Sequence, residues 1–138
     1  MPETQPKPFV FVLMPFDAAF KDLYELGIKA ACSEAGAYCE RVDEQIYEES
    51  ILQRVYNQIA KADLIVAEMT GRNPNVFYEV GYAHALGKEV ILLTQRADDL
   101  PFDLRGFNHI VYEGRITVLK EKLAQRLKAM LTNGPGKI

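Results

Sequence analysis

The chain has 138 residues, 49% of them hydrophobic, which is enough for one compact domain with a full apolar core. Its net charge is −3 and it contains no run of like charges, which excludes the basic surface of a protein that binds a nucleic-acid polymer. It shows no membrane-length apolar segment and no signal-peptide pattern, and it has two cysteines. We therefore expect a cytoplasmic protein with no membrane contact and reduced, mostly buried thiols.

Predicted strands and helices alternate along the chain. We expect residues 1–8 to be a flexible lead, 9–132 to form one domain, and 133–138 to be a loose tail. Short apolar or β-branched runs predict five strands, at residues 9–14, 38–42, 63–69, 90–94 and 109–112. Capping residues and helical periodicity predict four helices, at residues 18–35, 51–60, 76–86 and 116–131.

This alternation predicts an α/β fold with a doubly wound, five-stranded parallel sheet of the flavodoxin or Rossmann type. Right-handed crossovers favour the strand order 2-1-3-4-5. Residues 11–13, 64–66 and 91–93 are apolar on both alternating faces, so these runs should occupy the centre of the sheet. In the second helix, a helical stripe of apolar residues, the pattern of a face packed on a core, is formed by Ile51, Leu52, Val55, Ile59 and Ala60.

The predicted sheet places a ligand pocket at the carboxyl ends of its first and third strands, which lie side by side. Residues 14–17 follow the first strand and the turn 70–75 follows the third, while the acidic loop 43–49 lies near enough to contribute. The predicted substrate-binding residues are Met14, Pro15, Phe16, Asp17, Gly71, Arg72, Asn73, Asn75 and Tyr78.

Glu79 is the candidate catalytic residue. It lies about one turn inside the helix that leaves this turn, on a mostly apolar face with no basic residue three or four positions away. The helix N-terminus favours its ionised form, whereas partial burial opposes it. A carboxylate held at a pocket edge can attack a sugar carbon. The alternative is a solvated glutamate, or one paired with a distant cation.

Other patterns are less specific. Gly71 and Arg72 could admit a phosphate, although a lone glycine in a turn and a surface arginine are commoner. Aromatic side chains such as Tyr78 could stack on a base, although such residues more often pack in the core. Glu79 and His84 are five residues apart and lie on different helix faces, so we expect no metal site, and no motif predicts a cofactor.

The segment ADLIVAEMTGRNPNVFYEVGYAHALGK resembles the nucleoside 2-deoxyribosyltransferase superfamily, in particular its small bacterial TIR-like members. The opening FVLMPFD and the later LPFDLRGF are also similar to that group, so the resemblance covers nearly the whole domain. In the transferases and related nucleotide N-glycosidases, a Glu-hydrophobic-Gly stretch in this helix carries the nucleophile. The resemblance therefore implies that Glu79, followed by Val80 and Gly81, attacks the anomeric carbon.

The chain departs from this pattern at two acidic positions. Active relatives carry an aspartate on the preceding helix, where this chain has Val55, and a second acid before the nucleophile, where it has Asn73 and Asn75. General acid help accounts for about a hundred- to ten-thousandfold in rate, so its loss could leave a binding protein. Possible replacement acids flank the predicted pocket; they are Asp17, Asp43, Glu48 and Glu49.

Two functions follow from the sequence. The first is an enzyme that cleaves or transfers at the N-glycosidic bond of a nucleoside, nucleotide or NAD-like substrate. The alternative is a non-catalytic, nucleotide-binding sensor or signalling module. In either case the ligand is a nucleoside or nucleotide. The apolar surface of the last helix and of the aromatic-rich helix at 77–82 predicts a homo-oligomer, as the resemblance also implies.

Overall fold

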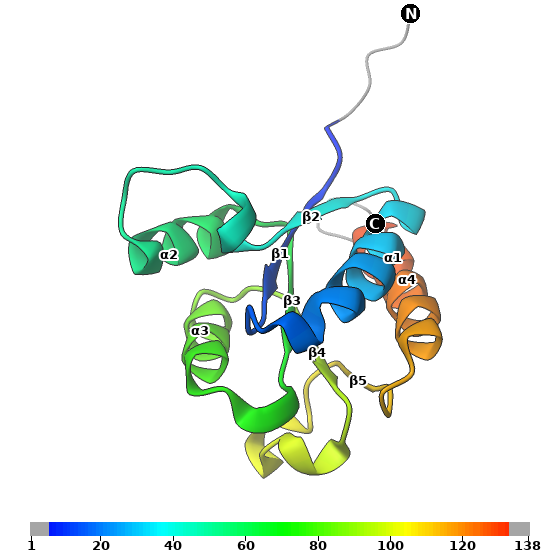
Figure 1. The fold of residues 1–138 in the computed structure, drawn as a ribbon. Helices are drawn as coiled ribbons and strands as arrows, with labels where there is room; N and C mark the ends of the chain where they lie inside the picture. The colour runs from blue at the N-terminus through cyan, green and yellow to red at the C-terminus, as the bar shows by residue number, and fades with distance from the viewer. Residues whose placement is uncertain (1–5, 133–138) are drawn as a thin grey trace, which may run out of the picture.

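The computed structural model describes residues 6–132. The expectations for residues 1–5 and 133–138 lie outside the described residues. Five parallel strands form one sheet in the order β2-β1-β3-β4-β5, which confirms the predicted α/β fold and strand order (Figure 1). The strands are β1 (Phe9–Leu13), β2 (Tyr38–Glu40), β3 (Leu64–Glu68), β4 (Val90–Thr94) and β5 (His109–Val111).

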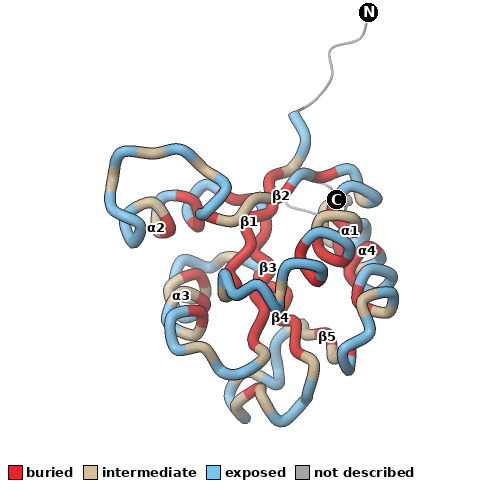
Figure 2. Tube along the Cα trace, in the orientation of Figure 1, coloured by how far each residue is buried: buried red, intermediate tan, exposed pale blue. Residues whose placement is uncertain are grey.

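The three central strands are buried along their full length, as their apolar runs predict (Figure 2). Val12 of β1 is in register with Val66 of β3, and Val66 is in register with Ile91 of β4. Alternate residues of each strand enter two separate hydrophobic clusters, one on each face of the sheet. Strands with apolar residues on both faces need helices packed against both faces of the sheet.

Helices cover both faces of the sheet (Figure 1). One face is covered by α1 (Lys29–Glu34) and α4 (Ile116–Thr132), and the other by α2 (Ile51–Lys61) and α3 (Pro74–Ala85). Over residues 6–132, no helix is both long and apolar enough to cross a membrane.

The predicted helix at 18–35 is helical but not continuous. It begins as a 3₁₀ turn at Ala18–Phe20, widens to a π-helix at Leu23–Ile28 and ends as α1. The π-helical part approaches α4 closely at Gly27, where a Cβ atom would lie 3.0 Å from the Leu119 side chain. A larger residue at this position would require the Leu119 side chain to shift.

The apolar stripe predicted for α2 faces the core only in part. Val55 and Ile59 are buried, but Ile51 is 59% exposed and Leu52 is 46% exposed. The first turn of α2 projects beyond the sheet, so these two side chains do not reach the core. They line a cavity instead.

Candidate functional site

The site lies where β1 and β3 end next to each other. Leu13, the last residue of β1, is in register with Ala67 of β3. The chain leaves β1 toward the α1 face of the sheet and leaves β3 toward the α3 face. Two neighbouring strands whose connections diverge in this way open a crevice at their carboxyl ends, where doubly wound proteins bind ligands.

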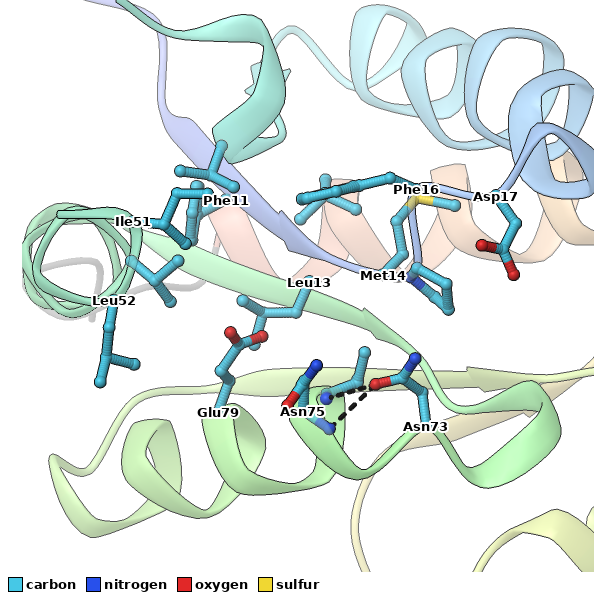
Figure 3. Close-up of a pocket in the computed structure, with 15 residues that line it drawn as sticks. Phe11, Leu13, Met14, Phe16, Asp17, Ile51, Leu52, Asn73, Asn75 and Glu79 are labelled. Atoms are coloured by element: carbon cyan, nitrogen blue, oxygen red, sulfur yellow. Dashed lines mark hydrogen bonds between the residues drawn. The ribbon is translucent and has the colours of Figure 1, made fainter. Parts of the chain in front are cut away.

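A cavity of about 430 Å³ fills this crevice, a size that suits a small organic ligand (Figure 3). Its wall comes from β1 and the segment after it, from the first turns of α2 and from the first turns of α3. The lining residues are Phe11, Val12, Leu13, Met14, Pro15, Phe16, Asp17, Val42, Ile51, Leu52, Val55, Asn73, Asn75, Val76 and Glu79.

Glu79 points from α3 into the cavity (Figure 3). Its side chain is half-buried, and no hydrogen-bond or ion-pair partner exists for its carboxylate within residues 6–132. Burial raises its pKa to about 7, because the charged form loses water without gaining a partner. A carboxylate with this pKa is partly ionised at neutral pH and free to contact a ligand.

The turn of α3 nearest the cavity is held by its own cap. Asn73 accepts hydrogen bonds through Oδ1 from the backbone N–H of Asn75 at 2.9 Å and of Val76 at 3.3 Å. Pro74 occupies the first helical position, where its missing N–H costs nothing. Asn73 and Asn75 line the cavity, as predicted, and their side-chain amides are its neutral polar groups.

Gly71 and Arg72, which were predicted to bind substrate, do not line the cavity. They belong to a turn, Thr70–Arg72, that is fixed against the loop after β4. The Gly71 N–H donates to Asp99 Oδ2 at 3.0 Å, and the Arg72 guanidinium donates to the Asp98 carbonyl. Gly71 has a left-handed backbone, with φ of 80°, a conformation that favours glycine.

Tyr78 also lies outside the cavity. It is on the exposed side of α3, where its hydroxyl is 2.6 Å from the Tyr56 hydroxyl. The Tyr56 ring stacks on Tyr82 with 4.3 Å between ring centres. These aromatic residues join α2 to α3.

Among the possible acid partners, Asp17 lines the cavity, and the structure leaves the other three outside it. Asp43 is bound by the guanidinium of Arg41 at 2.9 Å and 3.1 Å. Glu49 accepts a hydrogen bond from Asn57 at 3.2 Å, and Glu48 is exposed. Val55, at the position where relatives carry an acid, contributes an apolar wall.

A second carboxylate lies at the end of β3 but outside the cavity. Glu68 is fully buried; its Oε1 accepts from the Thr70 N–H at 2.7 Å and its Oε2 accepts from the Tyr112 hydroxyl at 2.6 Å. Burial raises its pKa, while the two hydrogen bonds oppose that rise. In the sequence, Glu68 is a single charged residue in the apolar run LIVAEM, and that pattern alone does not indicate its hydrogen bonds.

The residues that sequence reasoning missed are the apolar wall, in particular Ile51 and Leu52. The sequence carries no local signal for them, because Ile51 and Leu52 fit the same apolar stripe as Val55 and Ile59. Within residues 6–132, no group of three or more His, Cys, Asp or Glu side chains is arranged to hold a metal ion.

The fold and the cavity define a doubly wound α/β protein with a carboxylate-bearing ligand site at its switch point. The Nucleoside 2-deoxyribosyltransferase family matches residues 10–130, and the chain belongs to that family. Comparison with curated proteins gave no significant match.

Solved structures with a similar fold include a CMP N-glycosidase, a 2-deoxyribosyltransferase and a flavoprotein. The CMP N-glycosidase of Clostridium botulinum is 22% identical, with a TM-score of 0.64 over 88% of this chain and 98% of that one. A 2-deoxyribosyltransferase from Bacillus psychrosaccharolyticus is 13% identical, with a TM-score of 0.62 over 88% and 91%. A diflavin flavoprotein from Nostoc sp. is 16% identical, with a TM-score of 0.56 over 95% and 96%. These similarities support the fold.

Proposed function

We propose that the protein is an enzyme that cleaves or transfers at the N-glycosidic bond of a nucleoside or nucleotide. The observation that carries the proposal is the Glu79 carboxylate, which projects into the cavity at the ends of β1 and β3 and has no partner among the described residues. Membership of the Nucleoside 2-deoxyribosyltransferase family supports the same chemistry. So do the activities named for two structures of similar fold, the CMP N-glycosidase and the 2-deoxyribosyltransferase.

In this mechanism Glu79 is the nucleophile. Its carboxylate attacks the anomeric carbon, the bond from that carbon to the base nitrogen breaks, and the electron pair leaves with the base, which takes up a proton. Water or a second base then displaces Glu79 from the sugar. With a pKa of about 7, part of the Glu79 population is ionised at neutral pH. Because no cation is paired with this carboxylate among the described residues, its oxygens stay available to the anomeric carbon.

Asp17 is the candidate for the group that handles the proton. It and Glu79 are the two acidic side chains among the described residues that line the cavity, and they lie on different walls (Figure 3). An acid on a wall separate from the nucleophile can reach the leaving base while Glu79 faces the sugar.

A non-catalytic nucleotide-binding sensor is the second candidate function. Val55 favours it, because this wall is apolar where active relatives present an acid. The two functions differ in whether free base is released, since a sensor binds its ligand unchanged.

The deciding experiment is incubation of the purified protein with a panel of nucleosides, nucleotides and NAD, with free base followed by chromatography. Release from at least one substrate supports the enzyme. If no compound releases base while one of them binds in calorimetry, the sensor function replaces it.

We also propose that the protein is a cytoplasmic homo-oligomer. Ile51 and Leu52 of α2 and Tyr78 of α3 are large side chains left exposed, and a second copy of the chain could cover them. Cys32 and Cys39 are free and buried, which fits a reducing compartment. Sedimentation at about tens of micromolar should show an oligomer, and a strict monomer at this concentration would reject self-association.

A further inference from the structure

Three tyrosines form an aromatic cluster between α2 and α3. Tyr56 belongs to α2, while Tyr78 and Tyr82 belong to α3. The ring of Tyr56 stacks on that of Tyr82 with 4.3 Å between ring centres and 28° between ring planes. The hydroxyls of Tyr56 and Tyr78 are 2.6 Å apart, so one of them donates to the other. Both contacts made by Tyr56 therefore run across the gap between the two helices.

The Tyr56–Tyr82 stack lies one helical turn away from the cavity lining. Tyr56 follows Leu52 by four residues and Tyr82 follows Glu79 by three, so each tyrosine shares a helix face with a residue that lines the cavity. Leu52 approaches the cavity from α2 and Glu79 from α3 (Figure 3). The stack is the next layer between the same two helices, and it stands beside Glu79.

Electrostatics also places Tyr56 near Glu79. The hydrogen bond with Tyr78 is the largest of the effects that raise the pKa of Tyr56 to about 12, and repulsion by the Glu79 carboxylate is another. For Glu79 itself, burial raises the pKa to about 7. A half-buried carboxylate has such a pKa only while the side chains beside it keep water away.

The first turn of α2 gives Glu79 little cover. Ile51 is 59% exposed and Leu52 is 46% exposed, so this part of the cavity wall is open to solvent. Tyr56 is a larger side chain on the same helix, it is only partly exposed, and its ring is fixed by stacking on α3. It is therefore the group of α2 best placed to cover the carboxylate.

We propose that Tyr56 is a positioning residue for Glu79: its ring, stacked on Tyr82, bridges α2 and α3 and excludes water from the Glu79 carboxylate. The inference rests on the proposed function, since it gives Tyr56 a part in preparing the nucleophile. The ring carries this role, because the Tyr56 hydroxyl is bound to Tyr78 at an exposed position outside the cavity.

The groups around Glu79 allow hydration to be tested separately from charge. The three tyrosines of the cluster are neutral between about pH 5 and pH 8, so replacing one of them leaves the charge around Glu79 unchanged. Arg54, the cation on α2 nearest to the cluster in sequence, lies 2.8 Å from Gln45 and 3.6 Å from Glu49. Asp17 lies on another wall of the cavity.

The test measures the pKa of Glu79 by NMR titration of the glutamate side-chain carbons, with Glu79→Gln identifying the signal. We expect a value of about 7 in the wild type and a fall to about 6 or below in Tyr56→Ala, because water then reaches the carboxylate. Tyr56→Phe keeps the ring and should keep the wild-type value. An unchanged value in Tyr56→Ala, or equal falls in the two variants, would overturn the inference.

Two further variants control for the loss of a stacked ring. Tyr82→Ala removes the same stack from the α3 side and should give the same fall, which keeps the inference testable if Tyr56→Ala is unstable. Tyr38 is a partly exposed tyrosine of β2 whose ring lies 5.1 Å from that of Phe9. Tyr38→Ala should leave the pKa of Glu79 at about 7. A fall in this control as large as that in Tyr56→Ala would overturn the inference.

Activity separates this inference from the proposed function. If the protein releases base, the midpoint of its kcat/KM profile against pH should fall in Tyr56→Ala together with the pKa of Glu79. Base release with an unmoved pKa keeps the proposed function and overturns the role of Tyr56. A lowered pKa without base release from any compound of the panel keeps the effect of Tyr56 on Glu79 and rejects the enzyme.

Discussion

Two glutamates, Glu68 and Glu79, lie near the carboxyl end of the sheet, and burial raises the pKa of both. Glu68 is fully enclosed, and each of its oxygens accepts a hydrogen bond from a fixed donor. Glu79 is half-buried, faces a cavity and has no partner in the described chain. A raised pKa alone therefore does not distinguish them.

The two carboxylates differ in the protein hydrogen bonds that replace their lost hydration. Glu68 has exchanged its hydration for two protein donors, so it holds the end of β3 to Thr70 and to Tyr112. Glu79 has lost part of its hydration and gained nothing from the protein, which is a cost that stability alone would not retain. A ligand is the natural partner for such a group. Glu68 is thus structural and Glu79 is the candidate functional residue.

The largest expected effect is on turnover. Glu79→Gln keeps shape and hydrogen-bonding capacity but cannot supply the anionic nucleophile, so base release should fall about a thousandfold or more, equivalent to about 4 kcal/mol of barrier. Nucleoside binding should stay nearly intact in calorimetry. The matched control is Glu89→Gln, an exposed glutamate outside the cavity, which should turn over as the wild type does. Equal turnover in Glu79→Gln and wild type would remove Glu79 as nucleophile.

The next effect is on folding, and it concerns Glu68. Glu68→Ala leaves the Thr70 N–H and the Tyr112 hydroxyl without acceptors inside the core and opens a void, so the free energy of unfolding should fall by about 3 kcal/mol. Tyr112→Phe, which removes one of the two hydrogen bonds, should cost about 1 kcal/mol. Urea unfolding followed by circular dichroism measures both. A Glu68→Ala variant as stable as wild type would mean that Glu68 is not the structural member of the pair.

A third prediction concerns pH. Because burial raises the pKa of Glu79 to about 7 and the nucleophile must be ionised, kcat/KM should rise with pH and level off above that value. At pH values well below 7 the rate should drop about tenfold for each pH unit. The profile is measured with one nucleoside in overlapping buffers. A rate that is flat from about pH 5 to pH 8 would assign the ionisation to another group.

The smallest effect is a gain in stability from the same Glu79→Gln change. The Glu79 carboxyl has an ordinary pKa of 4.5 in the unfolded chain and about 7 in the folded one, so between these values the folded state holds more protons and stability falls as pH rises. Above pH 7 the full penalty of the buried charge is present. Since solvent still reaches the group and weakens this penalty, Glu79→Gln should be more stable than wild type by about 1 kcal/mol at pH 8.

The pH dependence of this gain identifies its cause. At about pH 4.5 the wild-type carboxyl is mostly protonated when folded, so the advantage of glutamine should shrink toward zero. Urea unfolding at the two pH values gives the comparison. A variant that is less stable than wild type at pH 8 would show that the Glu79 charge has a partner after all.

The sheet could be predicted from sequence because its signal is local. Runs such as Phe11–Leu13 and Leu64–Val66 are apolar on both faces, and that pattern by itself requires a central parallel strand. The position of Glu79 could be predicted because the turn before its helix follows the carboxyl end of β3, beside the end of β1. Asp17 and Asn73 entered the predicted pocket for the same reason.

The predictions that differ from the structure concern positions that are set by contacts between distant parts of the chain. The Gly71 N–H donates to Asp99, and the Arg72 guanidinium donates to the Asp98 carbonyl. The position of both acceptors depends on the path of the loop after β4. Local periodicity also placed Ile51 and Leu52 in the core, because it does not record that the first turn of α2 extends beyond the sheet. The π-helical segment of the first helix approaches α4 at Gly27, which is another contact between distant parts of the chain.

The turn Thr70–Arg72 is held in part by groups that come much later in the chain. Thr70 Oγ1 accepts from the Gln95 N–H, Gly71 donates to Asp99, and Glu68 receives the Tyr112 hydroxyl 44 residues further on. During synthesis, the strand and helix that carry Glu79 emerge before the residues that fix the turn between them. The catalytic geometry should therefore mature last: a nascent chain stalled before residue 95 would already contain every residue that lines the cavity and would still lack activity.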